Sequence, residues 1–390
     1  MIGTDWNVPR IDLAILTNNR AASLNRLLTS VQGAHYFGSN VHLGINLEQT
    51  RDKQTQQLVD SIHWPHGSMN IRRRIVLAGL MPAVVESWYP RDNHTYGVIL
   101  EDDVEVSPYF FAWLKFTILH YRYTTKGRAQ SQRMFGVSLY QQKNVELRPE
   151  GRRDFDAHKL FDALDIPFNT PYLGQVPCSW GAAYFPEIWR EYYDYLSIRL
   201  SETSIEISDI VVPELKSNRW PRSWKKYFNE LVYLRGYAML YPNYADFESF
   251  STNHLEQGTH IKAAVVDMKR KMQFEVPLMA DTDPTLLLEL PKSTLPEWPQ
   301  LPVVDLWGYL ATEEDVVTRG WTTMATMATC GEGTEAQLYQ LDRPPTYDAQ
   351  ELLCERVFEG ELDLSSVEEV EVGLEGNVSA GDVQPSMTLL

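Results

Sequence analysis

Over its first hundred residues the chain alternates short apolar runs with stretches that carry apolar residues at helical spacing. The runs cover residues 11–16, 41–47 and 96–100, with a weaker one at 71–77 that includes Arg72, Arg73 and Arg74. The stretches between them cover residues 24–31, 50–63 and 81–88. Strands and helices in this alternation predict an α/β fold with a mostly parallel central sheet and helices on both faces. Because ligands of such sheets bind beyond the carboxyl ends of the strands, the residues after each run are the first candidates for a site.

The fourth apolar run ends in three adjacent acids, Glu101, Asp102 and Asp103. Neighbouring carboxylates at the end of a buried strand repel one another and resist desolvation, so the fold must supply a cation beside them. A hard divalent ion, Mn²⁺ or Mg²⁺, suits carboxylate oxygens and also holds substrate phosphates. An exposed acidic turn is the alternative, but the apolar sequence on both sides of the triplet favours a metal site.

Further charged residues follow the other apolar runs. Arg20 ends the polar turn after the first run, and Glu48 closes the second. We expect both at the same edge of the sheet as the acidic triplet. Arg72, Arg73 and Arg74 either contact phosphate groups or form a solvated basic turn.

The rest of the chain divides into a second structured part and a long extension. Helices are predicted at 109–123, 187–199 and 224–235, and strands at 134–139 and 237–241. Residues 141–170 are charged and irregular, which predicts a surface loop or insertion. Repeated prolines in the region 277–302 predict an extended connector, followed by a small appendage, so that 276–350 form one unit. Residues 351–390 hold ten acids and one base and are predicted to be a disordered tail.

Composition excludes several classes of function. Asp and Glu number 52 against 35 Lys and Arg, a net charge of −17 that disfavours nucleic-acid binding. Cys178, Cys330 and Cys354 are too few and too scattered for a disulfide framework or a zinc site. The sequence shows neither a signal-peptide pattern nor an apolar segment of about 18 residues, which predicts a cytoplasmic protein without an integral membrane segment. No glycine-rich dinucleotide or P-loop motif is present, which disfavours nicotinamide dehydrogenases and P-loop enzymes.

One acid within residues 224–235 is the candidate general base. The predicted helix has a single apolar stripe, made of Trp224, Tyr227, Phe228, Leu231 and Leu234. Glu230 lies at the edge of that stripe, about 60° from Tyr227. A carboxylate there is partly desolvated, so its pKa can rise toward a value that suits proton transfer. A glutamate that only flanks the helix is the alternative, and Asp246 and Glu248 are the reserve candidates.

Two histidines, His254 and His260, lie on either side of Gly258. One of them could supply a second metal or phosphate contact to the site. A hydrogen-bonding surface histidine is the alternative.

The segment from Leu100 to Phe111 resembles the metal-binding segment of the Golgi β-1,2-N-acetylglucosaminyltransferase I family and related inverting glycosyltransferases of the GT-A fold. Those enzymes show a strand, then Glu-Asp-Asp, then a helix that starts with Pro and aromatic residues. The chain also resembles fungal proteins called family-2-like glycosyltransferases. The resemblance spans about residues 11–260 and implies a GT-A catalytic domain over 1–275, with a C-terminal extension. Within it, 1–125 would bind the nucleotide sugar and 126–275 the acceptor.

The resemblance also implies roles for single residues on the donor side. Arg20 would contact the nucleotide diphosphate, and Glu48 would recognise the uracil ring. Glu101 and Asp102 would hold the ribose and donor-sugar side. Asp103 would hold the metal, completed by His254, as a residue from this late loop does in many GT-A enzymes.

Other landmarks of the resemblance lie later in the chain. Trp180-Gly181 is similar to a Trp-Gly element between donor and acceptor sites. Segments 219–224 and 235–242 are similar to the Trp-Pro and Arg-Gly…Pro landmarks. The chain departs from the family in showing no N-terminal membrane anchor and no adjacent Asp-Asp in the presumed base helix.

These features together predict a metal-dependent inverting hexosyl- or N-acetylhexosaminyltransferase. It would move a sugar from a UDP-sugar to a hydroxyl of a small-molecule, lipid or glycan acceptor. Glu230 would take the acceptor proton while Mn²⁺ or Mg²⁺ neutralises the departing diphosphate. A catalytically silent sugar-nucleotide or glycan-binding protein and a metal-dependent nucleotidyl or phosphoryl transferase are the alternatives.

Overall fold

The structure, a computed structural model, describes residues 6–201, 210–256, 271–280 and 286–328. The acidic segment 351–390, His260, Cys330 and Cys354 lie outside the described residues, so the predictions for them are untested.

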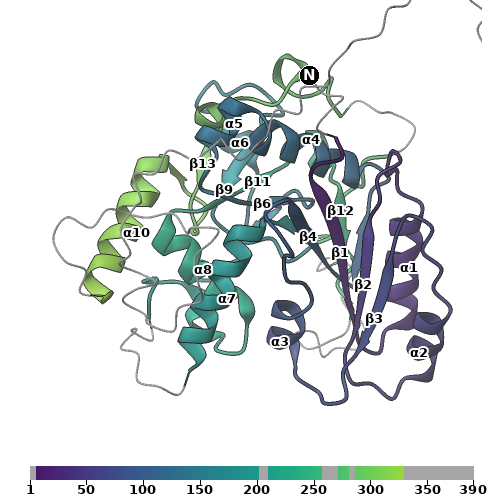
Figure 1. Ribbon diagram of the computed structural model, residues 1–390. Helices are drawn as coiled ribbons and strands as arrows, with labels where there is room; N and C mark the ends of the chain where they lie inside the picture. Colours follow the sequence, from purple (N-terminus) through teal and green to yellow (C-terminus); the bar gives the residue numbers. More distant parts are fainter. Residues whose placement is uncertain (1–5, 202–209, 257–270, 281–285, 329–390) are drawn as a thin grey trace, which may run out of the picture. The chain divides into compact units, whose positions relative to one another are not determined.

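The described residues form one large sheet with strand order β14-β13-β9-β11-β6-β10-β4-β1-β2-β3 (Figure 1). Its strands are β1 (Arg10–Thr17), β2 (His42–Leu47), β3 (Met69–Arg73), β4 (Thr95–Glu101), β6 (Met134–Ser138), β9 (Tyr172–Gly174), β10 (Ala182–Tyr184), β11 (Ala238–Tyr241), β13 (Val303–Val304) and β14 (Leu310–Ala311). The strands β4, β1, β2 and β3 are all parallel, and β10 is antiparallel to both β4 and β6. Two small sheets pair β5 (Val104–Val106) with β12 (Ser251–Asn253) and β7 (Asn144–Val145) with β8 (Arg153–Asp154).

Helices cover both faces of the sheet, and each face has its own apolar core. The first core receives side chains from α1 (Ala21–Gln32), α2 (Lys53–Asp60) and α4 (Phe110–Arg122). The second receives side chains from α3 (Leu80–Val85), α7 (Pro186–Leu200) and α8 (Trp224–Arg235). Figure 1 shows α1 and α2 beside β2 and β3, with α7 and α8 toward the other end of the sheet. The predicted α/β class, with a large, mostly parallel sheet between helices, is confirmed.

The position of β1 in the sheet explains why its run is apolar at every position except Asp12. Ile11, Leu13 and Ile15 belong to the first core, whereas Ala14 and Leu16 belong to the second. Successive side chains of a strand point to opposite faces, so a central strand covered on both faces needs apolar residues at nearly every position.

The third strand ends earlier than its apolar run predicts. The run over residues 71–77 predicts a strand, but β3 ends at Arg73, which pairs with Leu47 at the end of β2. The Arg74 backbone N–H still donates to the Leu47 carbonyl at 3.0 Å, and after Arg74 the chain leaves the sheet. Ile75, Val76 and Leu77 consequently lie in a loop, and they are 93%, 69% and 63% exposed.

Two regions that the sequence left irregular contain short elements. Between residues 141 and 170 the chain forms β7, β8 and α6 (Ala157–Asp162). After the proline-rich stretch, β13 joins the sheet beside β9, and α10 (Glu313–Ala328) packs on α8. The other short elements are α5 (Thr125–Gln130) and the 3-10 helices η1 (Lys216–Arg219), η2 (Ala245–Phe247), η3 (Pro291–Ser293) and η4 (Trp298–Gln300). The division of the chain at residue 275 stays a prediction.

Candidate functional site

The acidic triplet lies where the strand order reverses direction. Along the sheet the order runs β3, β2, β1 and then β4. The chain therefore adds β2 and β3 on one side of β1 and, after α3, adds β4 on its other side. The carboxyl ends of these parallel strands are level, because Leu16 pairs with Glu101 and Thr17 pairs with Leu47. Ligands of open α/β sheets bind at such reversals. The structure thus brings the triplet, Arg20 and Glu48 to one edge, as predicted.

Arg20 is the cation that the buried carboxylates require. Its guanidinium forms an ion pair with Asp102 and a second one with Asp103, at 3.2 Å from Nη1 to Oδ2. Asp102 is 1% exposed and also accepts a 2.8 Å hydrogen bond from the Thr17 hydroxyl. Burial by itself would lower the pKa of Arg20, but the two carboxylates raise it. The triplet is therefore neutralised in part by the chain itself.

Glu101 differs from its neighbours in protonation. Burial, followed by the charges of Asp103 and Asp102, raises the pKa of Glu101 to about 8. Burial also raises the pKa of Asp102 above its ordinary value, although Arg20 and the Thr17 hydroxyl oppose the shift. At neutral pH the Glu101 carboxyl is mostly protonated, so it can donate a hydrogen bond to a ligand oxygen.

The pairing of β5 with β12 brings a late loop to Asp103. The Asn253 side-chain amide donates to Asp103 Oδ1 at 3.0 Å, and the His254 backbone N–H donates to the Asp103 carbonyl at 2.9 Å. The His254 imidazole, however, lies 2.6 Å from Glu105 Oε2 and 3.5 Å from Glu275 Oε1. The prediction that His254 completes a metal site with Asp103 needs correction, because its ring faces these two other carboxylates.

Whether these residues fit a divalent cation depends on whether the protein supplies all the ligands or shares them with a substrate. Among the described residues, no group of three or more His, Cys, Asp or Glu side chains is arranged to hold a metal. Mg²⁺ and similar ions commonly use one or two carboxylates together with substrate phosphates. The Asp103 side chain is 18% exposed and lies beside Asp102, so the residues fit this shared arrangement. They do not fit a site built from protein ligands alone.

Trp180 and Gly181 reach the same edge from the antiparallel strand β10. Gly181 precedes Ala182, which pairs with Ile99 of β4, and it has a φ of +100°. A Cβ atom at Gly181 would come within 3.1 Å of Ser251 Oγ, so glycine fits this backbone conformation and this close contact. The Trp180 ring packs against Tyr140 and Phe274, with ring centroids 4.7 and 5.3 Å apart. The predicted Trp-Gly element therefore adjoins the end of β4.

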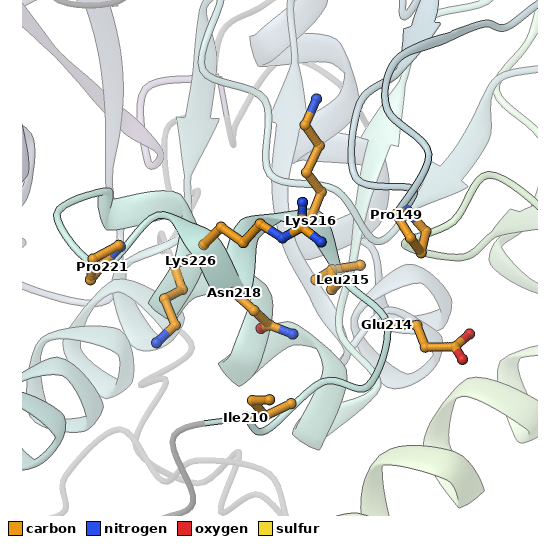
Figure 2. A pocket seen from close by; sticks show the side chains of 9 residues that line it. Pro149, Ile210, Glu214, Leu215, Lys216, Asn218, Pro221 and Lys226 are labelled. Atoms are coloured by element: carbon orange, nitrogen blue, oxygen red, sulfur yellow. The ribbon is translucent and has the colours of Figure 1, made fainter.

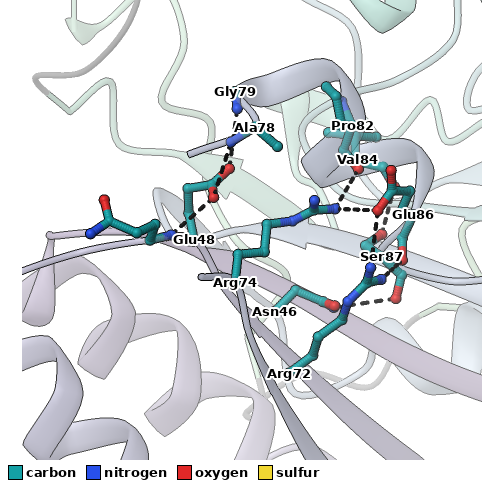
Figure 3. A network of polar contacts seen from close by, with 11 residues as sticks. Asn46, Glu48, Arg72, Arg74, Ala78, Gly79, Pro82, Val84, Glu86 and Ser87 are labelled. Atoms are coloured by element: carbon teal, nitrogen blue, oxygen red, sulfur yellow. Dashed lines mark hydrogen bonds and ion pairs between the residues drawn. The ribbon is translucent and has the colours of Figure 1, made fainter. Parts of the chain in front are cut away.

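The Glu48 carboxylate is hydrogen-bonded to backbone N–H groups of its own chain (Figure 3). Its carboxylate accepts backbone hydrogen bonds from Gln49 at 2.9 Å, from Gly79 at 3.2 Å and from Ala78 at 3.4 Å. Glu48 is 9% exposed. It holds the loop between β3 and α3, and its predicted contact with a uracil ring stays a prediction.

The three consecutive arginines near Glu48 form ion pairs with the chain. Arg72 and Arg74 both pair with Glu86, at 3.0 and 2.7 Å, and Arg73 pairs with Asp60 (Figure 3 shows Arg72, Arg74 and Glu86). The structure thus places these side chains on neighbouring carboxylates of α2 and the end of α3.

Glu230 does not lie with the triplet. It is 1% exposed on α8, where it accepts hydrogen bonds from the Tyr195 hydroxyl at 2.8 Å and from Arg199 Nε at 2.9 Å. Lys226, one turn earlier, lies 3.6 Å away. The sequence placed Glu230 at the edge of an apolar stripe, but α7 covers that edge. We correct this prediction: the surroundings of Glu230 are those of a buried ion pair.

A cluster that the sequence analysis missed links α8 to the triplet. The Lys225 ammonium forms an ion pair with Glu146, which also pairs with Arg152 at 3.4 Å. Lys225 and then Arg152 lower the pKa of Glu146 against the opposing effect of burial. Lys225 is close enough to Glu101 to favour its ionised form. The sequence offered one sign of this cluster, because Lys225 lies in the first turn of a helix, where carboxylates are preferred. No sequence spacing, however, links Lys225 to Glu146.

A cavity of about 590 Å³ lies beside the start of α8, where Lys226 lines it (Figure 2). It belongs to the half predicted to bind the acceptor, and its lining carries three cationic side chains and one acid. The lining residues are Pro149, Ile210, Glu214, Leu215, Lys216, Asn218, Arg219, Pro221 and Lys226. This volume is in the range of small-molecule sites.

Within the described ranges, no helix combines the length and the apolar character needed to cross a bilayer.

Similarity to known proteins is limited in extent. A family model described as the SPBC1E8.03c C-terminal domain matches residues 20–144. A search of curated proteins gave no match. Among solved structures, the chain is similar to S. aureus TarS 1–349, with 10% identity, 60% of each chain covered and a TM-score of 0.39. The complex of TarS 1–349 with UDP-GlcNAc gives 11% identity, 66% of this chain and 62% of that chain, and a TM-score of 0.37.

A third similar structure is the mannosyltransferase PcManGT from Pyrobaculum calidifontis in complex with GDP-Man and Mn²⁺. It has 13% identity and a TM-score of 0.34, over 60% of this chain and 55% of that chain. The chain spans less than two thirds of the length of these structures. Because all three TM-scores are below 0.5, the proposal below rests on the chain's own residues.

Proposed function

We propose that the chain is a glycosyltransferase that takes its sugar from a nucleotide sugar bound at the carboxyl ends of β4, β1 and β2. The observation that carries the proposal is the pairing of Arg20 with Asp102 and Asp103 at the point where the strand order reverses. A guanidinium and a cation-binding carboxylate side by side are what a diphosphate needs. The resemblance of residues 100–111 to GT-A enzymes supports the same reaction class.

In this proposal each acidic residue of the triplet has a different role. Asp103 holds Mn²⁺ or Mg²⁺ together with the diphosphate, and Arg20 donates to the phosphate oxygens. The cation would neutralise negative charge that develops on the leaving diphosphate. Glu101 would hydrogen-bond to a hydroxyl of the ribose or the sugar. Asp102 stays on Arg20 and Thr17 and fixes the position of the guanidinium.

The narrower points belong to the same proposal. The nucleotide is UDP, the sugar is a hexose or N-acetylhexosamine, and the transfer inverts the anomeric centre. The acceptor is a hydroxyl of a small molecule, lipid or glycan that approaches past Trp180, from the half that contains the cavity of Figure 2.

A sugar-nucleotide-binding protein without turnover is the second candidate. It is favoured by the surroundings of Glu230, because the predicted base is buried, is held by Tyr195 and Arg199 and does not lie with the triplet. The two candidates differ in turnover and not in binding.

Nucleotide release from a donor panel with Mn²⁺ tests the proposal. The panel is UDP-glucose, UDP-galactose, UDP-N-acetylglucosamine and GDP-mannose, each with and without EDTA. We expect Mn²⁺-dependent release from a UDP-sugar, lost in Asp103→Asn and kept in Asp60→Asn, an acid whose partner is the exposed Arg73. Tight UDP binding without release from any donor would favour the silent protein. Absence of binding to every donor would refute both.

A further inference from the structure

The cavity beside the start of α8 has walls that carry more positive than negative charge (Figure 2). Three of its lining side chains are cationic, and these are Lys216, Arg219 and Lys226. The lining contains one acid, Glu214. Lys226 already lies 3.6 Å from Glu230 of the same helix, so the surplus charge comes from the other two cations. In a chain with a net charge of −17, such a surplus at one cavity favours an anionic ligand.

Lys216 and Arg219 have no carboxylate partner within the described ranges. Both belong to η1, and neither forms an ion pair with an acid of that part of the chain, whereas Lys225 pairs with Glu146. Lys216 is half-buried and Arg219 is exposed. Because no ion pair holds these two side chains, they can turn toward a carboxylate or phosphate group and form charged hydrogen bonds with it.

A second, independent observation comes from Asn218, which lies between the two cations in η1 and lines the same cavity. Its side-chain N–H donates to the Val212 carbonyl at 2.8 Å. Its side-chain oxygen is buried and accepts no hydrogen bond from the residues that the structure describes. Buried polar atoms of folded proteins nearly always have a partner, so a hydroxyl or N–H group of a ligand would satisfy this oxygen.

The remaining walls of the cavity are apolar. Leu215 is 4% exposed and Ile210 is 60% exposed, and both line the cavity together with Pro149 and Pro221. A bare inorganic ion would leave this apolar surface uncovered, whereas a cavity of about 590 Å³ accommodates an organic molecule. The ligand that these walls fit therefore has an apolar body, an anionic group and a hydrogen-bond donor.

We propose that this cavity binds a small organic anion. Its carboxylate or phosphate group is held by Lys216 and Arg219, and its hydroxyl or N–H group donates to Asn218. The inference does not depend on the proposed function, because neither Arg20 nor Asp103 lines the cavity. A nucleic acid is disfavoured as the occupant, because the chain's net charge of −17 would repel a polyanion.

Calorimetry with three probes that share one aromatic body tests the inference. The probes 4-hydroxyphenyl phosphate and 4-hydroxybenzoate are anionic, and 4-hydroxybenzyl alcohol is neutral. EDTA is present, so that no divalent cation at Asp103 contributes to binding. We expect the anions, but not the alcohol, to bind the wild-type chain, and added salt to weaken this binding. Lys216→Gln/Arg219→Gln should weaken it about tenfold or more, because each substitution removes a charged hydrogen bond.

The matched control is Arg153→Gln/Lys159→Gln. It removes the same two kinds of charge from exposed positions, because these side chains are 60% and 84% exposed, and it should leave anion binding unchanged. An unchanged melting temperature establishes that each double variant is folded. Arg219→Gln alone, at an exposed position, should reproduce part of the loss.

The other outcomes separate support from refutation. Binding of only the phosphate ester or only the carboxylate supports the inference and assigns the anionic group. Absence of binding by both anions at about 1 mM overturns it, as does equal binding of the neutral alcohol. Equal weakening by both double variants would mean that overall charge, and not the cavity, attracts the anions. Displacement of the anions by UDP with Mn²⁺, in buffer without EDTA, would place them at the proposed donor site and overturn the inference.

Discussion

Replacement of Arg20 by methionine tests the claim that this side chain is the counterion of the acidic triplet. Methionine keeps most of the apolar stem but leaves Asp102, which is 1% exposed, without its cation. Removing one partner of a buried ion pair costs about 3–5 kcal/mol. The Arg20 side chain is 24% exposed and Asp103 is 18% exposed, so water screens part of the loss. We therefore expect Arg20→Met to lower the free energy of unfolding by roughly 2–3 kcal/mol.

A double-mutant cycle separates the pair from simple loss of packing. Asp102→Asn in the Arg20→Met background removes the unpaired charge, so the second substitution should cost much less there than in the wild-type chain. Residues in one ion-pair network show coupling energies of about 0.5–3 kcal/mol, and we expect the upper half of this range. Urea denaturation at pH 7 measures all four proteins.

The matched control is Arg10→Met. Arg10 pairs with Asp92, but this arginine is 60% exposed, so its loss should cost no more than about 1 kcal/mol. The reasoning is refuted if Arg20→Met costs no more than this control, or if the two substitutions at the triplet are additive.

Three further predictions concern other parts of the chain. Glu230→Gln should lower the free energy of unfolding by about 2–3 kcal/mol in urea, because it breaks the buried pair with Arg199; unchanged stability with lost nucleotide release would instead restore Glu230 as the base. Burial lowers the pKa of Lys115 to about 8, so between this value and its ordinary 10.5 the unfolded chain holds a proton that the folded chain does not. Lys115 should accordingly add roughly 2 kcal/mol to the stability of the wild-type chain relative to Lys115→Met between pH 8 and pH 10, as measured by denaturation of both proteins at each pH. The difference between the two proteins is the quantity to compare, because buried tyrosines with raised pKa values, among them Tyr172, Tyr184 and Tyr192, lower the stability of both as the pH rises to 10. EDTA should leave the melting temperature of the ligand-free chain unchanged and abolish UDP binding; a lower melting temperature in EDTA would mean that a metal supports the fold.

The parts of the fold that could be predicted are those in which each strand has its own local signal. The run before Glu101 has no charged residue because β4 is covered on both faces, and the run 11–16 is apolar at every position but Asp12 for the same reason. The prediction of a strand over residues 71–77 was wrong at its end, because the apolar residues Ile75, Val76 and Leu77 lie in an exposed loop, whereas β3 itself ends in two arginines. No local sequence pattern distinguishes a buried apolar residue from an exposed one.

The candidate site was predictable only where chain order sets position. The ends of neighbouring parallel strands must meet, so Arg20, Glu48 and the triplet could be brought together from sequence. Glu230 could not be judged in this way, because its partner Arg199 comes from α7 and no spacing between residues 199 and 230 reveals the pair. The same holds for Lys225 and Glu146, which are 79 positions apart in sequence.

The electrostatics at the end of β4 explain why a metal would be needed for substrate binding and not for the stability of the fold. With Glu101 mostly protonated at neutral pH, the charges of Asp102 and Asp103 face one guanidinium, which leaves about one negative charge at the edge of the sheet. The folded chain tolerates that charge, because Asp103 is partly exposed and Asn253 donates to it. A diphosphate at the same edge would bring further negative charge against Asp103, and Arg20, which also pairs with Asp102, would offset only part of it. A divalent cation held by Asp103 and the phosphates would turn this repulsion into attraction, so we expect a metal requirement only when the ligand binds.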